Sequence, residues 1–259
     1  MRIRYIEQGS GTPVVMLHGY TGTADRHFVA NGVFANIAKD HRAIAMDLRA
    51  HGKSGKPHDP KAYGDETAKD VIRLLDHLKI QRAHLVGYSL GAILAGRLIV
   101  TDPSRLASVA FIGAHPRREL NAFDTTFIAD SIKELESDLP FRSLAIALQT
   151  PGAPAPSDAE LRKMVAPLIA ANDVKAFAAM FRAGPFPLTT DAALKAAKFP
   201  MMEIIGTLDL SVSEVEPLKK AHPQIKMLVL EGATHGGEQG VLRRQETLPA
   251  LRELWATAR

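Results

Sequence analysis

An apolar run that ends in Gly-x-Ser-x-Gly and passes directly into a helical segment is the most constraining feature of this chain of 259 residues. The run begins at residue 83, and the motif occupies residues 87–91, with Ser89 at its centre. A strand that becomes a helix within so few residues crowds the backbone, which favours glycine around the turn and strains the turning residue. The sequence therefore predicts that the Ser89 hydroxyl projects from the carboxyl edge of a sheet.

Strand-like and helical segments alternate on both sides of this motif. Before it, strands are predicted at 3–8, 14–17 and 42–46, and helices at 28–39 and 67–78. After it, strands are predicted at 106–112, 201–205 and 227–230, and helices at 90–101, 214–221 and 247–258. Such alternation is typical of the α/β class, in which a mostly parallel central sheet carries helices on both faces and binds ligands at the carboxyl ends of its strands.

The stretch between residues 115 and 199 lacks strand patterns, and its apolar residues follow helical spacing. Within it, Ser157 and Glu160 form a capping-box pattern, which predicts the start of a helix. We therefore expect residues 116–198 to form a helical cap inserted before the strand that carries an acidic residue. Residues 1–115 and 199–259 are expected to form the α/β core.

Three residues with complementary chemistry each follow a predicted strand: Ser89, Asp209 and His235. A serine hydroxyl becomes a good nucleophile when an imidazole takes its proton, and that imidazole needs a carboxylate to fix its tautomer. We therefore predict that Ser89 is the nucleophile, His235 the base and Asp209 the acid, all at one sheet edge. The backbone N–H groups of Tyr20 and Leu90 are the candidate donors to an oxyanion.

Each of the three side chains also has a simpler interpretation. Ser89 could cap a helix, Asp209 could serve only its turn, and His235 could be an ordinary loop residue. The acid could also lie after the preceding strand, near His115 or Glu119.

Other polar residues are predicted to hold loops. His18 and His51 are expected to make hydrogen bonds rather than to carry protons, and Asp47 and Arg49 are expected to be structural. Candidates for the wall of a substrate pocket are His18, Tyr88, His115, Phe181 and Phe186, and the two phenylalanines could equally pack inside the cap.

Four ordered segments resemble the α/β-hydrolase superfamily, and the resemblance covers essentially the whole chain. Residues 18–20 resemble its oxyanion loop, 87–91 its nucleophile turn, 206–209 its acid loop and 232–235 its histidine loop. Residues 47–54 are similar to the loop Asp-x-Arg-Gly-His-Gly-x-Ser, except that Ala50 stands where glycine is usual, and Ala92 likewise replaces a frequent glycine. The resemblance implies a serine carboxylesterase-like member of that superfamily.

The expected function is hydrolysis of carboxylic esters with small to medium acyl chains through an acyl-enzyme, without a metal or an organic cofactor. The same triad could instead serve lactone hydrolysis, perhydrolysis or cleavage of carbon–carbon bonds. A non-catalytic ligand-binding protein on the same scaffold is the alternative from another class. Enzymes of the superfamily that open epoxides or carbon–halogen bonds typically carry Asp at the nucleophile position, so Ser89 disfavours those reactions.

Composition narrows the partners. The chain has no cysteine, which excludes thiol catalysis and cysteine-based zinc sites. Its formal charge of +4 comes from 32 Lys and Arg scattered among 28 Asp and Glu, which disfavours nucleic-acid binding. No apolar run approaches the roughly 18 residues of a membrane span. The chain as written suggests the cytoplasm, or the periplasm or exterior if a leader has been removed, and the oligomeric state stays open.

Overall fold

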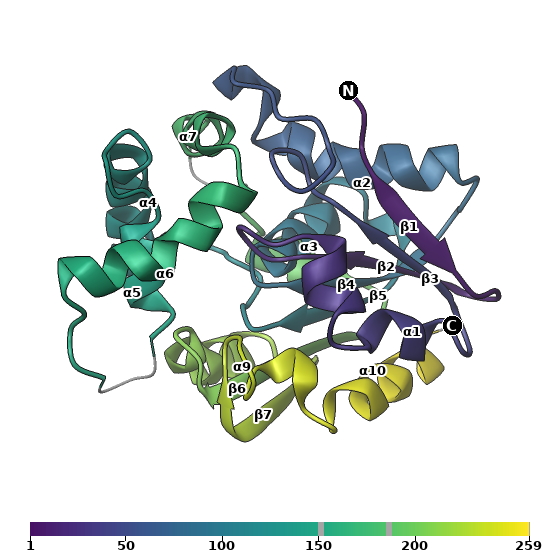
Figure 1. Cartoon of the computed structure of the whole chain (residues 1–259). Helices are drawn as coiled ribbons and strands as arrows, with labels where there is room; N and C mark the ends of the chain where they lie inside the picture. Colours follow the sequence, from purple (N-terminus) through teal and green to yellow (C-terminus); the bar gives the residue numbers. More distant parts are fainter. Residues whose placement is uncertain (150–152, 185–187, 259) are drawn as a thin grey trace.

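A single sheet forms the centre of the computed structural model, which describes residues 1–149, 153–184 and 188–258 (Figure 1). Within those residues it has seven strands in the order β1-β3-β2-β4-β5-β6-β7. Their bounds are β1 Tyr5–Gln8, β2 Pro13–Leu17, β3 Arg42–Met46, β4 Ala83–Tyr88, β5 Leu106–Ile112, β6 Met201–Leu208 and β7 Ile225–Thr234. Only β1 runs antiparallel to its neighbour. The predicted mostly parallel sheet is confirmed.

Helices cover both faces of the sheet, as predicted. On one face, α2 (Asp65–His77) and α3 (Leu90–Thr101) pack against apolar side chains of β2, β4 and β5, with α8 (Asp191–Ala196) and α9 (Val215–Ala221) at the margin. On the other face, α1 (Val33–Ile37) and α10 (Thr247–Ala256) close a second apolar core. Because both faces are covered, the inner parallel strands are largely continuous apolar runs, whereas β7 at the end of the sheet is partly exposed.

In its described part, the chain between β5 and β6 contains helices and loops but no strand. It contains α4 (Ala122–Glu134), α5 (Arg142–Ala147), α6 (Asp158–Ala171), α7 (Val174–Arg182) and α8. Phe177 and Phe181 of α7 are the largest fully buried side chains of a third apolar cluster, and α4 to α7 lie together at the left of Figure 1. The predicted capping box at Ser157 and Glu160 begins α6. The division into a core and a cap at residues 116–198 stays a prediction.

The predicted helix over residues 28–39 is wrong as a single element. The chain instead forms a π-helical turn at Asp25–Val29 and then the short helix α1, which begins after Gly32. Gly32 has a φ of 78°, a left-handed conformation that no continuous right-handed helix contains. The break turns Val29 outward, where it is 43% exposed.

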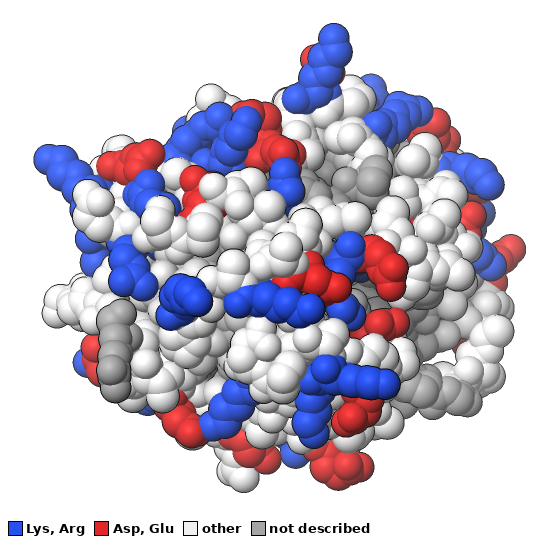
Figure 2. Space-filling model, turned by 180° about the vertical axis from the view of Figure 1, so that it is seen from behind, with Lys and Arg blue, Asp and Glu red and all other residues white. Residues whose placement is uncertain are grey.

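Charged side chains of both signs are interspersed over the face of the molecule shown in Figure 2. Among the residues that the structure describes, no single helix combines the length and hydropathy needed to cross a membrane. The pair α6 and α7 passes that test only when taken together, and the two helices meet at 91°.

Candidate active site

The turn between β4 and α3 places Ser89 at the carboxyl edge of the sheet. Ser89 has φ 54° and ψ −116°, a strained conformation for a residue with a Cβ, and its N–H donates to the Ile112 carbonyl at 2.8 Å. A Cβ on Gly87 would overlap the Gly91 carbonyl, and one on Gly91 would overlap the Leu17 carbonyl. Both glycines of the motif are therefore required by close backbone packing.

The Ser89 hydroxyl, the His235 ring and the Asp209 carboxylate form one hydrogen-bonded chain. His235 Nε2 lies 3.0 Å from Ser89 Oγ, and His235 Nδ1 lies 2.9 Å from Asp209 Oδ2. The second carboxylate oxygen of Asp209 accepts the Ser211 N–H at 3.0 Å, and Asp209 is buried. Since a carboxylate accepts, the proton of a neutral His235 lies on Nδ1, which leaves Nε2 free to accept from Ser89.

Strand register explains why the acid and the base meet. Asp209 follows the last residue of β6 and His235 follows the last residue of β7, and those two strand ends, Leu208 and Thr234, are paired in the sheet. The rival acid position is not used in this way, because within the described residues Glu119 is exposed and makes no hydrogen bond to His235.

The two residues whose amides are predicted to bind an oxyanion line the same cavity as Ser89. Leu90 is the first residue of α3, so its N–H lies at the positive end of the helix dipole. Tyr20 follows Gly19, whose backbone is so close that a Cβ there would lie 2.9 Å from the Ser89 Cβ. Neither the Tyr20 nor the Leu90 N–H has an acceptor within the described part of the chain.

Two aromatic side chains behind the site hold the loops that carry it. The Tyr88 hydroxyl donates to the His235 carbonyl at 2.8 Å, and the His27 ring packs edge-on against Tyr88 with centroids 4.9 Å apart. The Gly19 N–H donates to His27 Nδ1 at 3.1 Å, and burial lowers the pKa of His27 to about 3. His27 is therefore a neutral acceptor that orients the chain immediately before Tyr20.

Ser89 and His235 line two cavities. The larger has a volume of about 520 Å³ and a partly polar wall that includes Arg26, Arg243 and Tyr88. The smaller, of about 100 Å³, is walled mainly by apolar side chains of the helices α3, α4, α5 and α7, Phe181 among them. Two charged side chains, Arg117 and Asp124, also line the smaller cavity.

Two of the predicted pocket residues, His18 and His115, are not found in these walls. His18 is fully buried: it accepts the Leu48 N–H on Nε2 at 3.0 Å and donates from Nδ1 to the Gly19 carbonyl at 2.8 Å, so it braces two loops. His115 is outside both cavity linings, and burial lowers its pKa to about 4. Phe186 lies outside the described residues. His51 bonds the Arg49 carbonyl at 2.9 Å, in line with a loop-holding role.

Sequence reasoning did not identify His27 or Arg117. His27 lies in the short π-helical turn and Arg117 in a loop, and their importance comes from contacts across the fold that no spacing encodes. Among the described residues, no group of three or more His, Asp or Glu side chains is arranged to hold a metal ion.

Comparison with known proteins gives a family match and relatives with varied names. Residues 12–141 match a family model described as the alpha/beta hydrolase fold. The chain is 36% identical over 116 residues to the dihydrolipoyllysine-residue acetyltransferase component of the acetoin cleaving system of Pseudomonas putida, a match that covers 43% of this chain and 30% of that protein. It is 38% identical over 104 residues to an epoxide hydrolase of Caballeronia sordidicola, covering 40% of this chain and 31% of that protein. The chain thus spans about a third of the length of these relatives.

Among solved structures, a carboxylesterase of Nitrososphaera gargenis is similar with a TM-score of 0.76 and 20% identity, covering 98% of this chain and 94% of the other. At that identity the likeness concerns the fold alone.

Proposed function

The chain belongs to the alpha/beta-hydrolase fold family, and from that premise we propose that it is a serine hydrolase that cleaves carboxylic esters with small to medium acyl chains. The observation that carries the proposal is the hydrogen-bonded chain from Ser89 through His235 to Asp209. The names of the relatives vary, so the nucleophile type is the better guide to the reaction. A serine there favours attack on a carbonyl carbon.

The mechanism follows from the direction of the hydrogen bonds. As Ser89 Oγ attacks the ester carbonyl carbon, its proton moves to His235 Nε2, and Asp209 stabilises the resulting imidazolium through Nδ1–H. The Leu90 and Tyr20 N–H groups, which lack acceptors within the described chain, are assigned to the developing oxyanion. His235 then gives its proton to the departing alcohol, and a water molecule repeats the sequence to release the acid and regenerate Ser89.

The first test compares the wild type with Ser89→Ala on a p-nitrophenyl acyl ester. We expect turnover to fall by roughly three orders of magnitude or more, because Ala removes the only atom that becomes acylated. His27→Phe, which keeps an aromatic ring beside Tyr88 but removes the acceptor for Gly19, should lower kcat by a smaller factor, roughly tenfold. Full activity of Ser89→Ala would refute the assignment.

The alternative reactions are separated by the choice of acceptor and substrate. A lactone, and separately hydrogen peroxide with acetate, are tested beside the ester. A lactone preferred over the ester by more than tenfold in kcat/KM would move the proposal to lactone hydrolysis. An absent acyl-enzyme burst, with tight saturable ligand binding, would instead favour a binding protein.

A further inference from the structure

The smaller cavity beside Ser89 contains one feature that a simple apolar acyl pocket does not need. Its walls are mainly aliphatic and aromatic, yet Arg117 and Asp124 are among the residues that form them. They are the only Arg, Lys, Asp or Glu residues among its described lining residues. A buried ion pair in an apolar site is costly unless it serves structure or recognition.

Main-chain contacts hold both partners of this pair in place. The Arg117 carbonyl accepts the Thr189 N–H at 2.8 Å, and Arg117 Nη2 lies 2.9 Å from Asp124 Oδ1. Asp124 is in the first turn of α4, where its other oxygen accepts the Asn121 N–H at 3.3 Å in a capping box. Both Asp124 oxygens are therefore occupied, and the position of Arg117 is fixed before any substrate binds.

The Arg117 guanidinium keeps donors without acceptors. A guanidinium has five N–H groups, and Nε of Arg117 is buried with no partner among the described residues. The side chain is 18% exposed, and burial lowers the pKa of Arg117 in spite of the neighbouring Asp124 carboxylate. Since Nε is sealed from solvent, an oxygen of a bound substrate would pair with the partly exposed Nη groups, of which only Nη2 contacts a described carboxylate.

The net charge of the Arg117–Asp124 pair determines which kind of substrate oxygen this cavity favours. Arg117 and Asp124 together are neutral, so a substrate carboxylate would add an uncompensated negative charge to a desolvated site. A neutral acceptor, such as a keto or amide carbonyl, takes the hydrogen bond without that penalty. With a volume of about 100 Å³, this cavity is much smaller than the neighbouring one of about 520 Å³, which favours short acyl groups.

We propose that this cavity is an acyl subsite for short acyl groups that carry a neutral hydrogen-bond acceptor, which Arg117 binds. This deepens the proposed ester hydrolysis and rests on it. The acyl group remains bonded to Ser89 after the alcohol has left, so the narrower cavity suits the acyl part and the wider one suits the departing alcohol.

The test uses pairs of esters that differ only in the acceptor. Ethyl acetoacetate is compared with ethyl isovalerate, and ethyl levulinate with ethyl isocaproate, because each pair exchanges a carbonyl for a methyl-bearing carbon at the same place. The ratio of kcat/KM values, keto to alkyl, is measured for the wild type, Arg117→Met and Arg117→Lys. We expect the wild type to favour the keto ester of at least one pair, and both variants to lower that ratio by roughly tenfold or more. Lys keeps a cation for Asp124, so this variant remains informative if Met impairs folding.

The neighbouring arginine provides the matched control. Arg118 pairs with Asp191 at 3.2 Å and is absent from both cavity linings, so Arg118→Met should leave the ratio unchanged. An unchanged ratio in Arg117→Met and Arg117→Lys, with active enzyme, would overturn the subsite and leave ester hydrolysis intact. Failure of the wild type to cleave any of these esters would overturn both.

Asp124→Asn tests the charge argument directly. The variant leaves Arg117 as an uncompensated cation, so it should shift preference from ethyl levulinate toward monoethyl succinate, its anionic isostere, by roughly tenfold. No shift toward the succinate ester would contradict the electroneutral pair as the selecting feature.

Discussion

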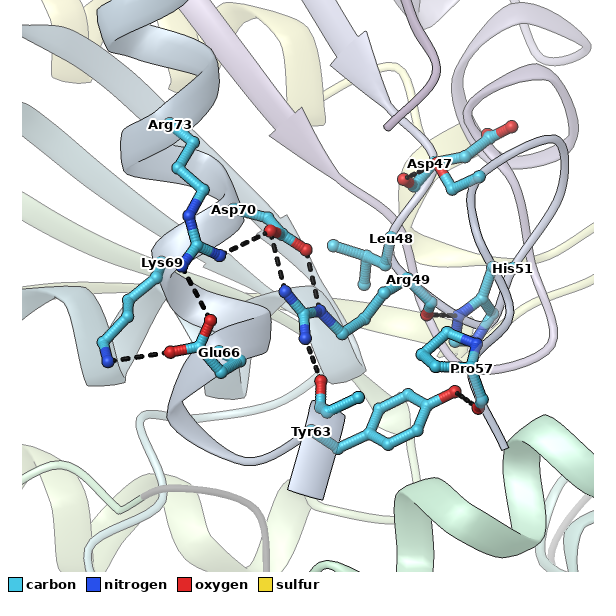
Figure 3. Close-up of polar contacts among 12 residues, drawn as sticks. Asp47, Leu48, Arg49, His51, Pro57, Tyr63, Glu66, Lys69, Asp70 and Arg73 are labelled. Carbon is cyan, nitrogen blue, oxygen red and sulfur yellow. Dashed lines mark hydrogen bonds and ion pairs between the residues drawn. The ribbon is translucent and has the colours of Figure 1, made fainter. Parts of the chain in front are cut away.

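Two buried pairs of arginine and aspartate differ in how many donors they leave unused. Arg49 Nε and Nη2 each lie 2.8 Å from an oxygen of Asp70, and Nη1 donates to the Ala62 carbonyl. Figure 3 shows the Arg49 guanidinium facing the Asp70 carboxylate. Arg117 makes one contact with Asp124, and its Nε has no partner in the described part of the chain. We call Arg49–Asp70 the closed pair, because every guanidinium nitrogen and both carboxylate oxygens have a partner. We call Arg117–Asp124 the open pair, because Arg117 keeps an unpaired donor among the described residues.

The difference shows that cavity size alone does not identify a ligand site. Arg49 and Asp70 line the largest of the described cavities, about 1020 Å³, but their donors and acceptors are directed at each other and at the protein. Arg117 borders a cavity of about 100 Å³ that also contains Ser89. We infer that the closed pair holds the fold and the open pair is available to a ligand.

Breaking the closed pair should give the largest loss of stability. Arg49→Met leaves the Asp70 carboxylate buried with only the exposed Arg73 beside it, so we expect the free energy of unfolding to fall by about 3 kcal/mol or more. Urea unfolding measures this loss. Arg117→Met removes a single ion-pair contact from a carboxylate that keeps the Asn121 N–H, and should cost less than half as much.

An exposed pair with the same fork geometry is the control. Arg97 contacts both Asp65 oxygens at 2.9 Å, but Asp65 is 49% exposed, so Arg97→Met should cost less than about 1 kcal/mol. Equal losses in Arg49→Met and Arg97→Met would remove burial as the reason for the difference.

Glu203 extends the comparison to a buried acid without a cation. It lies in β6, is 0% exposed, and neither carboxylate oxygen has a hydrogen-bond partner among the described residues. Burial, with a smaller contribution from the Asp209 charge, raises the pKa of Glu203 to about 8. The folded state therefore retains a proton that the unfolded chain loses near pH 4.5.

Stability should consequently fall as pH rises from about 4.5 to about 8, by up to about 1.4 kcal/mol per pH unit from this group. Between pH 5 and pH 8 we expect a loss of about 3 kcal/mol in the wild type, measured by urea unfolding, and a much flatter profile in Glu203→Gln. Glu231→Gln, at an exposed position of β7, is the control and should keep the wild-type slope. An identical slope in Glu203→Gln would show that this carboxyl does not titrate as described.

The smallest expected change in stability is at Ala50, in the loop that carries Arg49. Ala50 adopts a φ of 70°, which favours glycine, but its methyl group is fully buried in the third apolar cluster. For Ala50→Gly the relief of strain and the loss of burial should nearly cancel, leaving stability within about 0.5 kcal/mol of the wild type. Lys79 has a φ of 56° and is exposed, so Lys79→Gly should stabilise by about 0.5 kcal/mol. A gain in Ala50→Gly as large as that in Lys79→Gly would mean that the buried methyl contributes nothing.

The predictable part of the molecule is the part governed by repeating patterns. The strands before Ser89 and Asp209 were identifiable because parallel strands buried on both faces are short apolar runs, and the strand before His235 because of the apolar run at 227–230, although β7 is partly exposed. Parallel strands of one sheet end at the same edge. That edge is where the structure brings the three side chains within hydrogen-bonding distance, while their catalytic role remains a prediction.

The parts that escaped prediction depend on single backbone conformations or on contacts between loops. The predicted helix over 28–39 is interrupted at Gly32, which adopts a left-handed conformation between two helical segments. The single contact of Arg117 depends on where α4 begins, and the acceptor role of His27 depends on a loop folding back onto Gly19. No periodicity reports either arrangement.

The pairing of β2 with β4 has a mechanical consequence. Leu17 of β2 is paired with Gly87 of β4 in the sheet. The loop that carries the Tyr20 amide and the turn that carries Ser89 therefore begin beside each other. We therefore expect the Tyr20 amide and Ser89 to move together when the sheet twists. Their separation then depends on the few residues that follow each strand. For the same reason, we expect changes in the packing of the helices between β5 and β6 to leave the separation of the Tyr20 amide from Ser89 largely unchanged.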